Sequence, residues 1–226
     1  MTPPADGDNI MNTDTNKSLV RAAAALFLLA FFAIGAGPSG ASGDTEELPE
    51  LEGRWAKRVV MTSLSNPPVI GKVTSKTVTY LSVDVDQNGR TLDLHNRTCD
   101  IDIESSINSV RTIIPSSFVE AMPESDRSGV LVGDDGKPTL RINRQRSVLG
   151  ARLRQPTFEN LPDSSSDPRV VDADNDGHPG VTVEIEGMVS GRLYLVQRAW
   201  DAYTGTLESA DRITGTVEWN TEQSIL

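Results

Sequence analysis

Cysteine and histidine are nearly absent from this chain: its 226 residues include one cysteine, Cys99, and two histidines, His95 and His178. A single cysteine excludes an internal disulfide, so the fold must be held together by packing. Cys99 lies in a stretch where polar and apolar residues alternate, which predicts a small core residue rather than a reactive thiol. Two histidines are too few for a histidine-rich zinc site, and we expect His178 to be an exposed turn residue.

The sequence also lacks the short motifs of common enzyme classes. It contains no G-x-S-x-G elbow, no H-E-x-x-H pattern and no glycine-rich phosphate loop. Among its 32 acidic residues, any two could form the carboxylate pair that glycoside hydrolases use. Abundance of acids is not a sign of such a pair. We therefore expect a non-catalytic protein, with a carboxylate hydrolase as the least favoured alternative.

Basic residues are also fewer than acidic residues. The chain has 21 Lys and Arg against 32 Asp and Glu, a net charge of −11. Residues 1–43 hold three Asp against one Lys and one Arg, so −10 remains on the rest of the chain. A body so acidic repels phosphate backbones and anionic lipids at long range. Nucleic acid is therefore excluded as a partner.

One long apolar run is present, over residues 22–37, and it directly follows Lys17 and Arg21. A basic segment, an apolar segment and an exit of small residues are typical of a secretory signal. Cleavage is expected after Ala41 or Gly43, which predicts a periplasmic or extracellular protein that touches the membrane only through residues 1–43. The alternative is an uncleaved anchor, but its uninterrupted apolar part is shorter than the roughly 20 residues that span a bilayer.

Beyond the acidic linker 44–52, alternation with a period of two dominates, as in residues 78–85, 100–104 and 181–186. Asn-Gly, Asp-Gly and Thr204-Gly205 pairs are read as turns between strands. A helical period is confined to residues 115–121. The sequence predicts one all-β domain over 53–226, an antiparallel meander that forms a barrel or a sandwich around a single apolar interior. Gly205 and Gly215 are expected at bends or bulges of this meander.

Two aspartate-rich segments resemble calcium-binding loops. Asp172, Asp174 and Asp176 have the spacing D-x-D-x-D-G, in which alternate carboxylates converge on one hard cation. The twelfth position of that loop is Val183, where such loops carry a glutamate. The segment that begins at Asp84 repeats the pattern with fewer acids, and we interpret it as an exposed strand end before a turn. A Ca²⁺ ion at the first loop is the only cofactor that the sequence suggests.

The predicted domain opens with Gly53-Arg54-Trp55, which resembles the G-x-W of lipocalins and the wider calycin group. The resemblance implies a β-barrel with Trp55 as the plug of one end. It also implies an arginine packed over the indole ring, for which Arg212 is the first candidate and Arg198 the second. We therefore expect a binding or structural module that holds a small apolar ligand. A calcium-stabilised surface or matrix module that uses the Asp172 loop is the alternative.

Overall fold

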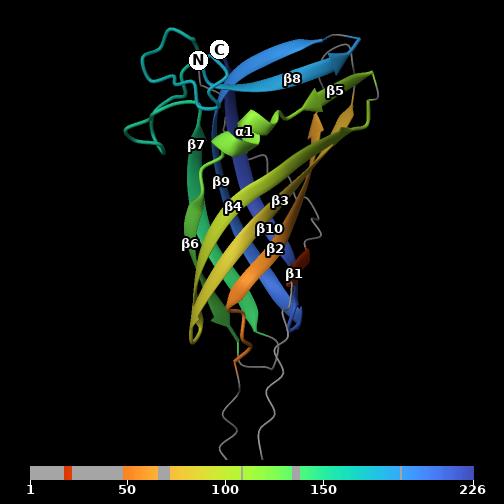
Figure 1. The fold of residues 1–226 in the computed structure, drawn as a ribbon, viewed down its shortest axis with the longest axis vertical. Helices are drawn as coiled ribbons and strands as arrows, with labels where there is room; N and C mark the ends of the chain where they lie inside the picture. The colour runs from red at the N-terminus through yellow and green to blue at the C-terminus, as the bar shows by residue number, and fades with distance from the viewer. Residues whose placement is uncertain (1–17, 22–47, 66–71, 108, 134–137, 189) are drawn as a thin grey trace, which may run out of the picture.

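The computed structural model of the protein describes residues 18–21, 48–65, 72–107, 109–133, 138–188 and 190–226 (Figure 1). The predicted export segment beyond Arg21 lies outside these residues. The prediction of an all-β fold is confirmed, and the predicted short helix is also present. The elements are β1 (Ser18–Arg21), β2 (Gly53–Ser65), β3 (Val73–Asn88), β4 (Thr91–Ser105), β5 (Val110–Ile113), α1 (Ser116–Ala121), β6 (Ser125–Val132), β7 (Thr139–Leu149), β8 (Val181–Gly187), β9 (Gly191–Ser209) and β10 (Arg212–Ile225).

The long strands pair antiparallel in the order β2-β3-β4-β6-β7-β9, and β10 pairs with the other side of β9. β8 also pairs with β9, at residues 191–195 of β9, and β5 pairs with β8. Among the described residues no ladder joins β2 directly to β10, so the sheet formed by β2 to β10 is not closed. The short β1 lies between these two edges and pairs with each of them.

A gap in the pairing of β4 sets the position of the helix. β6 pairs only with residues 91–96 of β4, so the second half of that strand has no neighbour from β6. α1 packs there, in contact with β4 and β8 (Figure 1). Its buried residue, Phe118, faces the interior. The helix thus covers the end of the sheet where β5 and β8 branch off.

The interior holds two apolar clusters rather than the single core expected from the sequence. The Trp55 cluster consists of Leu51, Trp55, Val83, Val85, Leu92, Leu94, Leu131, Leu140, Ile142, Leu207 and Ile213. The Phe118 cluster consists of Phe118, Leu149, Val181, Val183 and Leu195. Lys57 and the guanidinium of Arg127 are buried next to the Trp55 cluster, where both lie over the ring of Tyr203. Polar side chains at these buried positions interrupt the apolar alternation of their strands.

A β-bulge overturns the prediction that Cys99 is buried. Leu81 is opposite Thr98, whereas the preceding residue, Tyr80, is opposite Asp100. Cys99 is therefore the extra residue of β4, and its side chain is exposed. A bulge changes which face the later residues occupy. As a result Thr98 and Ile101 both line the interior, although they are three positions apart.

Gly205 and Gly215 form a cross-strand pair in regular register inside the β9–β10 ladder, so the predicted turn at Thr204-Gly205 is wrong and neither glycine is at a bulge of this ladder. A Cβ on Gly215 would overlap the carbonyl oxygen of Thr204 and lie 2.7 Å from the Cα of Gly205. The two glycines allow the strands to approach more closely than any side chain would permit.

Gly215→Ala is expected to lower the free energy of unfolding by about 2–3 kcal/mol, because the added methyl group meets backbone and not a movable side chain. Gly191→Ala is the matched control: it lies at the start of β9, and a Cβ there would meet nothing within 4 Å. The measurement is urea unfolding of both variants. Equal effects of the two substitutions would show that the Gly205–Gly215 approach does not need glycine.

Candidate functional site

A cavity of about 900 Å³ lies inside the sheet, between the Trp55 cluster and the Phe118 cluster. Strands β2 to β10 and helix α1 all contribute to its wall. Part of the wall is apolar and buried, including Val59, Val183 and Val217. At the β10 rim Thr221 and Gln223 are exposed, so the cavity opens to solvent there. Its size is in the range of sites that hold small molecules.

The floor of the cavity is a network of polar side chains above the Trp55 cluster. Tyr203 packs against that cluster and also lines the cavity. Its hydroxyl donates to Oδ2 of Asp201 at 2.7 Å. The guanidinium of Arg127, only 6% exposed, is 2.6 Å from the other oxygen of Asp201. Arg127 also donates to the main-chain carbonyls of Asn143 and Asp201, at 2.9 and 2.8 Å.

Lys57 contacts this floor without lining the cavity, and only 5% of its surface is exposed. Its ammonium lies over the ring of Tyr203, 3.2 Å from the centroid, which is a cation–π contact. Burial, together with the like charge of Arg127, lowers the pKa of Lys57 to about 7, while Asp201 acts in the opposite direction. Burial and the neighbouring Asp201 carboxylate raise the pKa of Tyr203, so this phenol stays protonated.

Two polar atoms at this floor have no hydrogen-bond partner: Nε of Arg127, a donor, and Oε1 of Gln145, an acceptor. Both residues line the cavity. Buried polar atoms are normally satisfied, and each one left unpaired costs free energy. A ligand that offers one acceptor and one donor would satisfy both atoms.

Sequence reasoning missed Lys57, Arg127, Asp201 and Tyr203. The sequence does contain a signal for Lys57. Trp55, Lys57 and Val59 occupy alternate positions of one strand and so lie on the same face. A lysine between two buried residues on that face must point inward. The other residues had no comparable signal. Asp201 and Tyr203 are two positions apart on β9, but Arg127 is on β6, and the pairing of β7 with both β6 and β9 brings it to them.

Two carboxylates line the cavity, Glu124 and Asp201. Each is already engaged by a basic group: Glu124 lies 3.3 Å from Nε2 of His95, and Asp201 is held by Arg127. The other ring nitrogen of His95 is 2.7 Å from Asp126. The hydrogen bond to Asp126 and the charges of both acids raise the pKa of His95. This arrangement favours a structural role for the two carboxylates over the acid and nucleophile of a hydrolase.

Trp55 and Arg212, the predicted plug and its cover, differ in burial. Trp55 is 2% exposed and donates from Nε1 to the carbonyl of Leu51 at 2.8 Å. Leu51 itself is buried, although it falls in the predicted linker. Arg212 is exposed at the start of β10, and Arg198 is paired with Glu222. In the described part of the chain the cation–π contacts join Lys57 and Arg127 to Tyr203 and Arg144 to Trp200.

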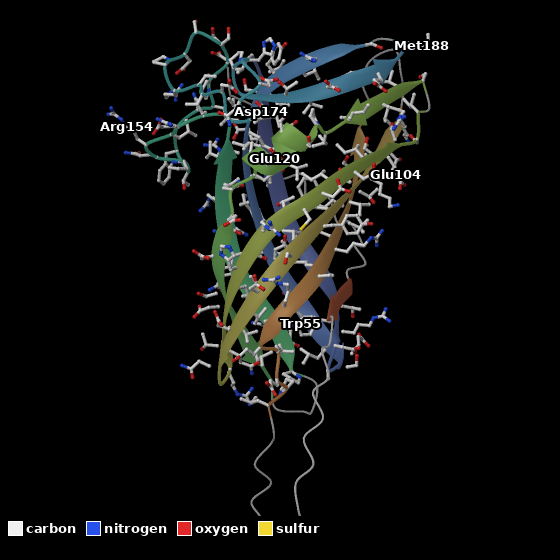
Figure 2. All side chains as sticks on the ribbon, in the orientation of Figure 1. Trp55, Glu104, Glu120, Arg154, Asp174 and Met188 are labelled. Carbon is white, nitrogen blue, oxygen red and sulfur yellow. The ribbon has the colours of Figure 1, made fainter. Side chains whose placement is uncertain are left out.

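The structure brings together Asp172, Asp174 and Asp176, as predicted for a metal loop: each offers a carboxylate oxygen, and these lie within 4.8 Å of one another. The loop lies at the end of the molecule opposite Trp55 (Figure 2). The second aspartate-rich segment does not make such a cluster, because Asp84 is paired with Arg54 at 2.7 Å. His178 stacks on Tyr194, with ring centroids 4.5 Å apart.

Comparison with models of protein families, with curated proteins and with solved structures finds no match to this chain. The lipocalin relationship therefore stays a prediction from Gly53, Trp55 and the strand pattern. Within the described residues, the structure contains no helix with the length and hydropathy needed to cross a membrane.

Proposed function

We propose that this protein is an exported binding module that holds one small amphipathic molecule in the cavity. The observation that carries the proposal is the cavity of about 900 Å³ between the two apolar clusters. Well-packed interiors leave few voids larger than a water molecule, so a space of this size within a sheet is typical of a ligand site. The opening at the β10 rim supplies a route for entry.

The chemistry of the wall supports a molecule with a polar head and an apolar tail. The unpaired Nε of Arg127 would donate to an oxygen of the head, and Oε1 of Gln145 would accept from a hydroxyl or amide. The tail would follow the apolar wall formed by Val59, Ile101 and Val217. A protonated carboxylic acid or a hydroxylated chain has both a polar head for the floor and an apolar tail for the wall. A pure hydrocarbon would leave Nε of Arg127 and Oε1 of Gln145 without hydrogen bonds.

We also propose that the sheet works as a barrel in which β2 and β10 are the two edges that meet. In the full chain β1 pairs with both edges, so they lie only one strand apart. β1 belongs to residues 1–43, and its removal on export would leave β2 and β10 free to pair directly. The pairing of β9 with β10 supports the same strand order. In such a barrel the Trp55 cluster would fill one end and α1 would cover part of the other. This agrees with the resemblance to lipocalins, in which a tryptophan plugs one end of the barrel.

The test is titration with a fluorescent dye that brightens in apolar surroundings, followed by displacement with a long-chain carboxylic acid and with the alkane of equal length. We expect saturable binding of about one dye per chain and displacement by the acid at lower concentration than by the alkane. Ala199→Trp, which fills the cavity, should abolish dye binding.

Ala202→Trp is the matched control for this experiment. It is on the same strand but on the other face, and it does not line the cavity. The control should bind dye like the wild type, and circular dichroism establishes that both variants are folded. Dye binding that survives Ala199→Trp, or that both substitutions remove equally, contradicts a ligand site in this cavity.

A further inference from the structure

The loop that contains Asp172, Asp174 and Asp176 links the Phe118 cluster to β8. Ala173 packs against the Phe118 cluster, and its N–H donates to the carbonyl of Gly180 at 2.9 Å. Thr182, near the start of β8, donates from its main-chain N–H to Oδ2 of Asp174 at 2.9 Å. The position of the Asp174 carboxylate is therefore fixed by β8 and does not depend on the loop alone.

Asp174 carries the observation that points to a ligand. The residue is 6% exposed, and its second oxygen, Oδ1, is buried without any hydrogen-bond partner. Two further carboxylates lie beside it, within the 4.8 Å span of the cluster. A buried, unpaired oxygen next to two like charges is costly. Burial, and then the charges of Asp176 and Asp172, raise the pKa of Asp174.

From this geometry we propose that the Asp172 loop is a Ca²⁺ site, in which Oδ1 of Asp174 and one oxygen each from Asp172 and Asp176 bind the ion. The ion would supply the partner that Oδ1 lacks and neutralise the repulsion among the three carboxylates. This proposal is independent of the cavity and its ligand, because it depends on different residues.

The other two carboxylates are already oriented by the backbone. Asp172 accepts the N–H groups of Asp176 and Gly177, at 3.2 and 2.9 Å. Asp176 accepts the N–H of His178 at 2.9 Å and the hydroxyl of Thr182 at 2.6 Å. A carboxylate oxygen that accepts one hydrogen bond still has a lone pair for a metal. Binding would thus need little rearrangement of these residues.

The donor set favours calcium over softer metals and predicts modest affinity. All three side-chain ligands are carboxylate oxygens, which suit a hard cation, and His178 is stacked on Tyr194. Val183 stands where a bidentate glutamate would add two oxygens, and Glu184 is 3.5 Å from Arg192. With water completing the coordination shell, we expect a Kd of about 10⁻⁴–10⁻³ M, as in extracellular calcium modules.

The test compares thermal unfolding in 10 mM CaCl₂ with unfolding in chelator at equal ionic strength. For the wild type we expect calcium to raise the Tm by about 3–10 °C. Asp174→Asn should have two opposite effects. Its Tm in chelator should exceed that of the wild type, because a buried charge is removed, and its response to calcium should be lost. Asp163→Asn, an exposed aspartate of the preceding loop, is the matched control and should keep the full response.

A wild-type Tm that is the same in calcium and chelator overturns the proposal. So does a calcium response that Asp174→Asn retains, or one that Asp163→Asn loses to the same extent, because general charge screening would then explain it. If Asp174→Asn does not fold, calorimetric titration of the wild type with CaCl₂ decides: one saturable site supports the proposal, and the absence of binding heat and of a Tm shift refutes it.

Discussion

Lys57→Met is expected to raise the free energy of unfolding at pH 7 by about 2 kcal/mol. A pKa lowered from 10.5 to about 7 corresponds to about 5 kcal/mol of cost for keeping this buried ammonium charged. The contact with the ring of Tyr203 recovers part of that cost, so the net gain is smaller. Methionine has a similar volume and a flexible side chain, and it would bring no charge beside Arg127.

The same residue predicts how stability depends on pH. Between about pH 7 and pH 10.5 the unfolded chain keeps the proton of Lys57 and the folded protein releases it. The unfolded state then binds more protons, so the free energy of unfolding rises with pH over this window. Below about pH 7 both states hold the proton, and the contribution no longer changes. From pH 7 to pH 9 we expect Lys57 to contribute a rise of about 2 kcal/mol in the free energy of unfolding.

Urea unfolding at pH 7 and pH 9 measures both effects. Lys57→Met should be more stable than the wild type at pH 7. Its free energy of unfolding should also rise less between pH 7 and pH 9, because the contribution of Lys57 is missing. Lys72→Met, which replaces an exposed lysine, is the control and should change stability by less than about 0.5 kcal/mol. A variant Lys57→Met that is less stable than the wild type would mean that the ammonium makes a net favourable contact, contrary to this account.

Trp55→Ala is expected to lower the free energy of unfolding by about 4 kcal/mol. Trp55 is almost completely buried in the larger apolar cluster, and its removal leaves a hole that the seven strands of this cluster cannot readily close. It would also leave the carbonyl of Leu51 without the N–H that now donates to it. Trp55→Phe keeps a six-membered aromatic ring but loses the N–H donor and the rest of the indole, so it should cost less, about 1–3 kcal/mol.

Thermal or urea unfolding of the two variants gives these values. Phe158→Ala removes another large aromatic side chain, but one that is 82% exposed, and it should cost less than about 0.5 kcal/mol. If Trp55→Ala is no more destabilising than Phe158→Ala, the Trp55 cluster does not support the end of the sheet as we describe.

The sheet was predictable because a strand is a local pattern. Residues 78–85, 100–104 and 181–186 alternate in sequence, and all lie in strands. The helix at Ser116–Ala121 was also foreseen. Asp172, Asp174 and Asp176 are spaced along one short loop, so their convergence follows from local geometry alone. Each of these features involves residues that are close in the chain.

The sequence predictions were wrong where the position of a residue depends on the neighbouring strand. Cys99 belongs to an alternating stretch, but the bulge opposite Tyr80 and Leu81 turns it outward. Thr204-Gly205 is a turn pair by its sequence, yet Gly205 faces Gly215 across a regular part of the β9–β10 ladder. Register across two strands depends on bulges and close contacts between them. Neither is encoded in the period of a single strand.

The sequence by itself determined the strands, the acidic surface, the rarity of cysteine and histidine, and the aspartate loop, because composition and short periods fix all of these. Tertiary structure alone decided that Lys57, Arg127, Asp201 and Tyr203 meet, and that a cavity remains above them. The physical reason is that these side chains come from three strands, β2, β6 and β9, and only the pairing and stagger of the sheet bring them to one point.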